Sequence, residues 1–253
     1  MVNVKAVSDY INKFAPYDTQ CSWDNSGMLV GDTDKEIKKI GICLDLTQQT
    51  LFEAKKEKVD LVITHHPLIF APQKNFLAGD KAYELAKSGI ALISAHTPFD
   101  CAKGGVNDVL CEILGIRDAV GLESAESEVP MARIGTVDEI FSSDFALLVA
   151  KKLGTVCRVV DCKNTVKKVA VCGGAGMDFV FDALREGADA YVTGEIKHHE
   201  MLLAKEKGIT VIDAGHFQTE NPSMTAIKKM LEEEFKSVEF VLLKQTAPVE
   251  FIG

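Results

Sequence analysis

The sequence predicts an α/β protein built from two related, intertwined lobes with mainly parallel sheets. Short β-branched runs alternate with helical patterns along the 253 residues, a rhythm typical of parallel strands covered by helices on both faces. Residues 38–66 also align without a gap over residues 167–195, which indicates an internal repeat. We expect a first lobe over residues 1–121 and a second lobe over residues 122–253. Whether the C-terminal segment returns to the first lobe is left open.

The first half is predicted to run β-α-β-α-β. Residues 39–44 form a strand, and Thr47 caps a helix that continues to Lys58. The next elements are a strand at 60–64, a helix at 81–88 and a strand at 90–95. These strands are apolar on both faces, as expected for strands buried inside a parallel sheet.

The second half repeats this order. Identities between the halves include the pairs Lys38/Lys167, Lys39/Lys168 and Asp60/Asp189, and GIALISA at 89–95 matches GITVIDA at 208–214. The segment 122–166 is assigned to the second lobe. It holds a polar stretch at 123–128, a strand-like run at 133–137, a helix at 145–154 capped by Ser143 and a strand at 157–161.

Composition excludes several classes of protein. The 28 Lys and Arg face 37 Asp and Glu, a net charge of −9, which argues against binding to nucleic acid through phosphate contacts. No apolar run approaches the roughly 18 residues that a membrane span requires, and the N-terminus lacks the layout of a signal peptide. The seven cysteines are scattered without a CxxC pair, which predicts reduced thiols and a cytoplasmic protein.

The histidines hold the most informative positions. All six lie just beyond the ends of predicted strands, in equivalent places of the two repeats: His65, His66, His96, His198, His199 and His216. Asp100 and Glu220 follow four residues after His96 and His216. Ligands bind at the carboxyl ends of parallel strands, and imidazole with carboxylate suits Zn, Mn or Fe. We therefore expect a shared metal site.

Local sequence refines this expectation. Asn221 is a good N-cap and Pro222 a good first helical residue, so His216 and Glu220 are predicted to share a strand-to-helix loop. The segment from His96 to Asp100 is expected to form a similar loop. An isolated histidine at a strand end is more often a hydrogen-bonding residue than a ligand. Adjacent His65 and His66 would also point to opposite faces of an ideal strand, a constraint that lapses where the strand ends.

Five motifs carry a resemblance to a known family: WDNSGMLVGD (23–32), THHPLIF (64–70), SAHTPFDCAKGGVND (94–108), TGEIKHHE (193–200) and DAGHFQTE (213–220). Together they resemble the NGG1-interacting-factor-three-like family, whose members are often labelled GTP cyclohydrolase 1 type 2 homologues. Segment 122–166 is too short for the extra domain of longer members, so the chain resembles the short form.

The resemblance implies two intertwined α/β lobes with a dinuclear metal site at their interface, and assembly into a toroidal homohexamer. The implied ligands of two divalent ions per subunit (Zn, Fe or Mn) are His65, His66, Asp100, His216 and Glu220. Glu220 would bridge the ions. His198 stands where the family often has tyrosine and is not assigned.

The first functional hypothesis is a metal-dependent hydrolase, similar to GTP cyclohydrolase, that acts on a small molecule such as a nucleotide or another phosphorylated compound. His96 and His199 are candidates for proton transfer or for orienting the ligands. The loop Gly173–Gly176 either cradles phosphate or forms a tight turn. In the turn from Trp23 to Gly27, Asn25 either contacts substrate or forms a structural Asx turn.

The second hypothesis is a metal-binding scaffold or regulatory ring without enzymatic activity, in which the ions stabilise the assembly. Its discriminating test is Asp100→Ala. Loss of turnover from an intact ring would favour the enzyme, whereas loss of the ring in a protein without turnover would favour the scaffold.

Overall fold

The computed structural model describes residues 1–124 and 129–250. The chain divides into two compact units. Their bounds are Met1–Ala102 with Met224–Thr246 for unit 1, and Lys103–Ser223 with the segment that begins at Ala247 for unit 2. The chain thus leaves unit 1, builds unit 2 and returns to unit 1. Residues 125–128 of the polar stretch expected at 123–128 lie outside the described residues.

Unit 1 contains a sheet with the strand order β1-β4-β3-β2-β11. The strands are β1 (Gly27–Val30), β2 (Lys39–Cys43), β3 (Leu61–Thr64), β4 (Ala91–Ser94) and β11 (Glu239–Leu242). Strands β4, β3, β2 and β11 are parallel to one another, and β1 is antiparallel to β4. The predicted strands at 39–44, 60–64 and 90–95 are therefore confirmed. Every residue of β3 and β4 is buried, which explains their continuous apolar character.

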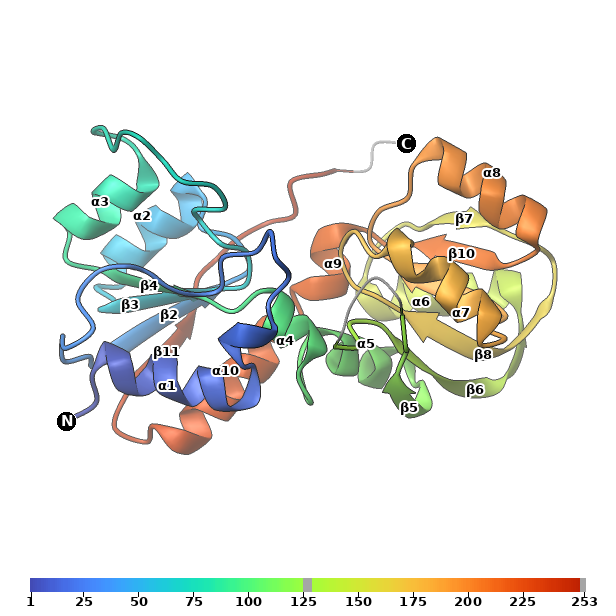
Figure 1. The fold of residues 1–253 in the computed structure, drawn as a ribbon, viewed down its shortest axis with the longest axis horizontal. Helices are drawn as coiled ribbons and strands as arrows, with labels where there is room; N and C mark the ends of the chain where they lie inside the picture. The colour runs from blue at the N-terminus through green and yellow to red at the C-terminus, as the bar shows by residue number, and fades with distance from the viewer. Residues whose placement is uncertain (125–128, 251–253) are drawn as a thin grey trace. The chain divides into compact units, whose positions relative to one another are not determined.

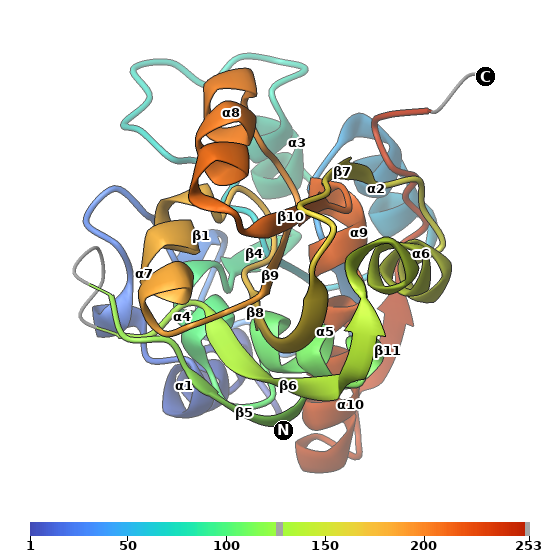
Figure 2. The same ribbon diagram turned by 90° about the vertical axis from the view of Figure 1, so that its right-hand side faces the viewer.

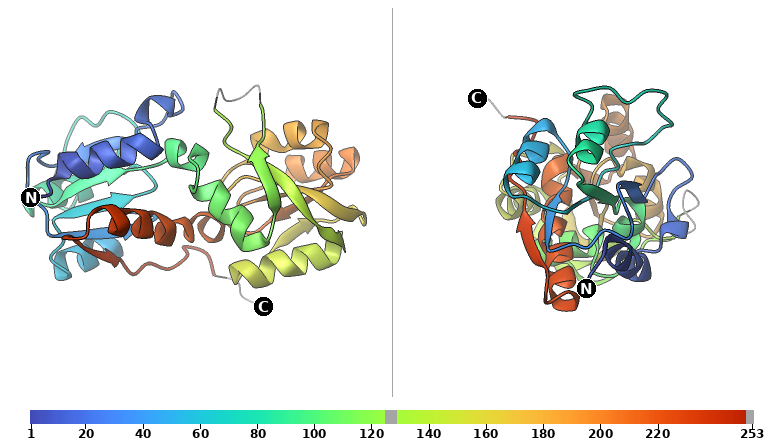
Figure 3. Two further views of the ribbon diagram at one scale, coloured as in Figure 1. Left: turned by 90° about the horizontal axis from the view of Figure 1, so that it is seen from below. Right: turned by 90° about the vertical axis from the view of Figure 1, so that its left-hand side faces the viewer.

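Helices cover both faces of this sheet, with α2 and α3 on one face and α1 and α10 on the other (Figure 1). The helical elements are α1 (Val4–Phe14), the 3₁₀ turn η1 (Tyr17–Thr19), α2 (Gln48–Lys56), α3 (Lys81–Lys87), α4 (Thr97–Cys101) and α10 (Ser223–Glu234). Thr47 caps α2 as predicted, through a capping box with Thr50. Helices α1 and α10 lie side by side (Figure 3), with the rings of Tyr10 and Phe235 centred 5.4 Å apart.

Unit 2 contains a mixed sheet with the order β5-β6-β8-β9-β10-β7. The strands are β5 (Arg117–Gly121), β6 (Arg133–Phe141), β7 (Arg158–Val160), β8 (Thr165–Val171), β9 (Ala190–Thr193) and β10 (Thr210–Asp213). Only β8, β9 and β10 are parallel; β5, β6 and β7 join antiparallel. The expectation of a mainly parallel sheet is thus right for unit 1 and wrong for unit 2. Among the described residues between β5 and β6 there is no helix, and a parallel pair would need a long crossover.

The helices of unit 2 also lie on both sides of its sheet, α5 and α6 on one side and α7 and α8 on the other (Figure 2). The helical elements are α5 (Val106–Leu114), α6 (Ser142–Leu153), the 3₁₀ turn η2 (Met177–Phe179), α7 (Val180–Arg185), α8 (His198–Lys207) and α9 (His216–Glu220). Helix α6 is preceded by Phe141, and Ser143 lies inside it, so the predicted Ser143 cap is wrong. The hydroxyl of Ser142 instead donates to Asp161, 2.6 Å away.

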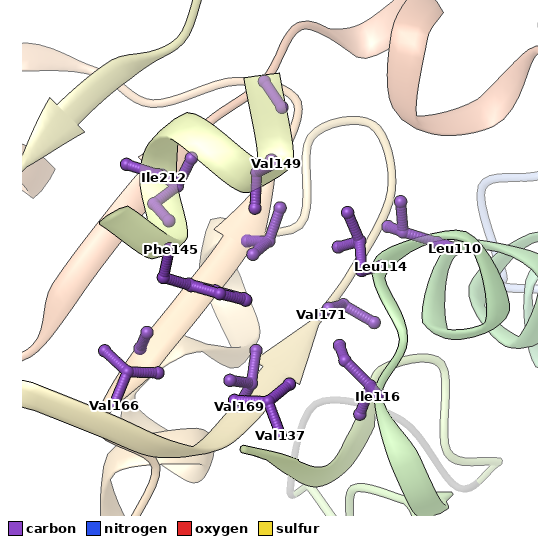
Figure 4. Packing of buried hydrophobic residues seen from close by; sticks show 14 of the residues in the cluster. Leu110, Leu114, Ile116, Val137, Phe145, Val149, Val166, Val169, Val171 and Ile212 are labelled. Atoms are coloured by element: carbon purple, nitrogen blue, oxygen red, sulfur yellow. The ribbon is translucent and has the colours of Figure 1, made fainter. Parts of the chain in front are cut away.

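Alternate residues along the strands of unit 2 supply two separate cores. Val169 and Val171 pack with Phe145 of α6 in the cluster of Figure 4. Ala170, one position out of phase, packs with Tyr191 and with side chains of α7 and α8. Both faces of the sheet are therefore buried, which holds the carboxyl ends of its parallel strands in place.

Matching hydrogen bonds support the internal repeat. In unit 1, the carboxylate of Asp60 accepts from the amides of Lys38 and Lys39, at 2.8 and 3.1 Å. In unit 2, the aligned Asp189 accepts from the amides of the aligned lysines, 167 and 168, at 2.9 and 2.8 Å. The same carboxylate accepts from backbone amides of the first strand of each repeat, at the start of β2 and within β8, so the identities have one structural cause.

Candidate metal centre

Two neighbouring strands of unit 1 bring three histidines together. His65 and His66 follow β3, and His96 follows β4, which is parallel to β3. The ring centroids are 4.9 Å apart for His65 and His66, 5.0 Å for His65 and His96, and 5.4 Å for His66 and His96. One nitrogen from each ring lies within 4.8 Å of the others, close enough to hold a metal ion. These three residues are called the imidazole cluster below.

Adjacent His65 and His66 can share this cluster because the strand has ended. The amides of both residues donate to the same carbonyl oxygen, that of Leu44, at 3.2 and 3.1 Å. A regular ladder would give these amides separate partners and would point the two side chains to opposite faces. The expectation that the alternation of faces lapses before Pro67 is confirmed.

Each imidazole of the cluster is oriented by an oxygen atom at Nδ1. His65 faces the carbonyl of Ala95, His66 faces Oδ1 of Asp45 and His96 faces Oδ1 of Asp24, each at 2.8 Å. These oxygens are acceptors, so each Nδ1–H donates, and a neutral ring would offer Nε2 as the metal ligand. Histidines that bind metals have this arrangement, in which the second nitrogen donates to a carboxylate or carbonyl.

Asp24 is the most strongly held of these acceptors. Its carboxylate is inaccessible to solvent and accepts from His96, from the Thr97 amide and hydroxyl, from the Ser26 hydroxyl and from the Asn25 amide. Burial by itself raises the pKa of Asp24, but the hydrogen bonds and charge of its partners outweigh burial and place this pKa well below its usual value. The carboxylate is therefore ionised and rigid.

Asp100 adds a carboxylate beside the cluster. It is buried in α4, and its Oδ1 lies 3.5 Å from Nε2 of His65. The sequence prediction placed Asp100 in a loop, which is wrong, because α4 begins directly after His96 with Pro98 in its first turn.

Unit 2 supplies a second pair of ligand-type residues on α9. Nε2 of His216 lies 3.0 Å from Oε2 of the buried Glu220, and Nδ1 of His216 lies 2.8 Å from Oε1 of Glu195. His216 therefore has the same oriented ring as the histidines of unit 1. The prediction that His216 and Glu220 share a loop is wrong. They lie one helical turn apart, because Gly215 with a φ of 88° starts α9 and Asn221 ends it.

The glycine loop after β8 packs against this pair. A Cβ at Gly174 would lie 2.1 Å from Oε1 of Glu220 and 3.1 Å from Nε2 of His216. The amide of Gly173 donates to Asn107, that of Gly174 to Thr219 and that of Gly176 to Thr193. Since these amides already have side-chain partners, the loop is a tight turn that leaves room for Glu220, and the phosphate cradle is not supported.

The other residues singled out in the sequence are not among the ligand-type residues described above. His198 and His199 are exposed in the first turn of α8. The side chain of Asn25 donates to the carbonyl of Ile69 at 2.6 Å, so its role is structural, through a distant loop and not through the expected Asx turn. The seven cysteines are free thiols, and burial raises the pKa of Cys43 and of Cys111 to about 12, so neither supplies a thiolate.

Sequence reasoning missed the acceptors Asp24 and Asp45. Asp45 carried a usable signal, because it follows β2 at the same sheet edge as the histidines. Asp24 carried a weaker one, because it lies in the motif at residues 23–32, but its partner His96 is 72 residues away and no local pattern joins the two. No helix among residues 1–124 and 129–250 has the length and apolar character needed to cross a bilayer.

Comparisons with known proteins agree with these motifs. The Duf34/NIF3 (NGG1p interacting factor 3) family matches residues 2–248. The GTP cyclohydrolase 1 type 2 homolog of Clostridium perfringens is 35% identical over 257 residues, covering 97% of this chain and 98% of the relative. The NGG1-interacting factor 3 of Saccharomyces cerevisiae is 32% identical over 258 residues, covering 88% of each chain. The crystal structure of Staphylococcus aureus hypothetical protein SA1388 superposes with a TM-score of 0.92 at 26% identity, covering 99% of each chain.

Proposed function

The chain belongs to the Duf34/NIF3 (NGG1p interacting factor 3) family, and on that premise we propose that it is a divalent-metal-dependent hydrolase with a dinuclear centre. One observation carries the proposal. Four imidazoles, those of His65, His66, His96 and His216, donate Nδ1–H to a fixed oxygen, which makes Nε2 the nitrogen for a metal ion or for a proton. Histidines that serve only as surface or capping residues have no need of this shared orientation.

Five side chains would hold the two ions: His65, His66 and Asp100 from unit 1, and His216 and Glu220 from unit 2. Nitrogen and carboxylate oxygen donors fit Zn, Fe or Mn. When bound, such a pair of ions lowers the pKa of water towards neutrality and stabilises developing negative charge on oxygen.

His96 is the proposed proton carrier. Asp24 holds its Nδ1–H, so Nε2 is the atom that accepts a proton and later returns it to a leaving group. The ionised Asp24 also stabilises the imidazolium that forms in between. His199 is a second candidate for proton transfer, because its exposed ring on α8 has free access to solvent.

A small-molecule substrate follows from the same premise. Relatives named as GTP cyclohydrolase 1 type 2 homologues suggest a nucleotide as the substrate, and a bound metal pair would supply the activated water for its hydrolysis. The experiment is a turnover assay with metal-loaded protein and a panel of nucleotides and phosphoesters. Asp100→Asn should abolish turnover, whereas Asp9→Asn, at an exposed ion pair with Lys5, should not.

A scaffold is the second candidate, favoured by the relative that is named for an interaction, NGG1-interacting factor 3. The proposed homohexamer would have about six times the chain mass of 27.5 kDa in light scattering. If the panel gives no turnover and Asp100→Ala dissociates the assembly, the scaffold replaces the hydrolase. If Asp100→Ala leaves the assembly intact and removes turnover, the hydrolase stands.

A further inference from the structure

Two exposed aromatic side chains of unit 1 flank the imidazole cluster. Trp23 is 59% exposed and Phe70 is 49% exposed. Their ring planes are inclined by 27°, with centroids 6.5 Å apart. Both rings meet His96 edge to face, at 5.6 Å from Trp23 and 5.7 Å from Phe70. Two large apolar rings are thus exposed to solvent beside the imidazole cluster of unit 1, whose three histidines could hold a metal ion.

The loops that carry these rings are held rigidly. Asn25, two residues after Trp23, donates to the carbonyl of Ile69, which directly precedes Phe70. Asp24 anchors the same turn through five hydrogen bonds. Because the backbone already holds these rings in place, a ligand that covers them loses little binding free energy to ordering the loops. Loops positioned by a rigid scaffold are also where binding residues concentrate.

The aromatic side chains of Trp23 and Phe70 favour planar aromatic ligands. Aromatic faces stack on heteroaromatic bases, with an energy that tolerates the identity of the base. Phosphate has no comparable partner in the glycine loop of unit 2, where the amides of Gly173, Gly174 and Gly176 already donate to side chains. Recognition through a ring therefore fits this protein better than recognition through a phosphate cradle.

We propose that Trp23 and Phe70 form a stacking platform for a planar heteroaromatic ring of the nucleobase class, held beside His96. The inference rests on the proposed function for the reaction itself, but binding to the platform needs no metal and no turnover. The ring is the anchor of the substrate, and the remainder of the molecule extends to the imidazole cluster.

The sequence provides a direct reporter, because Trp23 is the only tryptophan in the chain. The full-length protein is titrated with guanosine, adenosine and ribose 5-phosphate while the fluorescence of Trp23 is recorded. Both nucleosides should quench this fluorescence with saturation, and ribose 5-phosphate should not. Phe70→Ala should weaken nucleoside binding by at least about fivefold. Phe76→Ala, which removes another exposed phenylalanine from the same loop, is the matched control and should change nothing.

Two further experiments distinguish failure of the stacking platform from failure of the proposed function. Phe70→Leu, which keeps apolar volume without a π face, should bind nucleosides as weakly as Phe70→Ala, and calorimetry on Trp23→Leu should show the same loss. Protein treated with EDTA should still bind nucleosides. If the treated protein binds but the loaded protein turns nothing over, only the hydrolase fails. Absence of saturable quenching, equal quenching by ribose 5-phosphate, or unchanged affinity in Phe70→Ala would overturn the platform.

Discussion

Replacing Gly174 with alanine should disturb the proposed metal ligands of unit 2 while leaving the unit folded. Gly174 has a φ of +62°, and an added Cβ would lie 2.1 Å from Oε1 of Glu220 and 3.1 Å from Nε2 of His216. The Glu220 carboxylate is the end of a flexible side chain, so it can move aside. That movement displaces one proposed ligand directly and changes its contact with the other.

Gly154 provides a matched control in the same unit. Its φ is +63°, it ends α6, and no atom of the described residues lies within 4 Å of an added Cβ. Either alanine should lower the free energy of unfolding by about 1–2 kcal/mol, which is the cost of a Cβ in the left-handed region. Only Gly174→Ala should also lower metal affinity, by about 10–100-fold, because the supporting geometry of the ligands is lost.

The assay pairs urea unfolding of EDTA-treated proteins with calorimetric titration of Zn²⁺. Urea unfolding measures the loss of stability from a Cβ in the left-handed region, which both variants should show. The titration measures the loss of metal affinity, which only Gly174→Ala should show. Equal metal affinities for Gly154→Ala and Gly174→Ala would refute the placement of Gly174 against the metal ligands.

Three further substitutions test the supporting contacts. Asp24→Asn keeps the side-chain size but removes the charge that fixes the proposed proton carrier His96, so turnover should fall about 10²–10⁴-fold; unchanged turnover would contradict the orienting role. Glu195→Gln should instead lower metal affinity about 10–100-fold through the proposed ligand His216 in a chelator competition, and a fall in stability without a fall in affinity would show that this carboxylate is only structural. Burial raises the pKa of Asp60, but hydrogen bonds from two backbone amides and the nearby lysine outweigh it and hold this pKa below its usual value. The Asp60 carboxylate therefore stabilises the fold above its unfolded pKa of about 4 and loses this effect as the pH falls through the folded value. The stability difference between the wild type and Asp60→Asn should narrow in acid, and a difference independent of pH would exclude this cause.

The elements that sequence reasoning found are those with strong local signals. Residues 39–44 and 60–64 were recognisable because strands buried on both faces are continuously apolar. Thr47 was recognisable because a hydroxyl before a helical pattern satisfies an otherwise free amide. The internal repeat also made Asp189 recognisable, because it aligns with Asp60 and its carboxylate likewise accepts a hydrogen bond from the amide of an aligned lysine.

The elements that sequence reasoning missed are short or depend on distant partners. Helices α4 and α9 have five residues each, too few for a periodic pattern, so the ligand-type residues Asp100 and Glu220 were assigned to loops. The antiparallel additions to the sheet of unit 2 come from segments outside the repeat. The contact between Asp24 and His96 is formed only by the tertiary fold, because nothing in either local sequence specifies it.

X-ray absorption at the metal edge of protein purified with its native metal, combined with elemental analysis, examines the proposed centre itself. We expect about two divalent ions per chain, with nitrogen and oxygen in the first coordination sphere and an imidazole scattering pattern. Sulfur in that sphere would contradict the proposed ligands, as would a protein that retains no metal after purification and takes up none from Zn²⁺, Fe²⁺ or Mn²⁺.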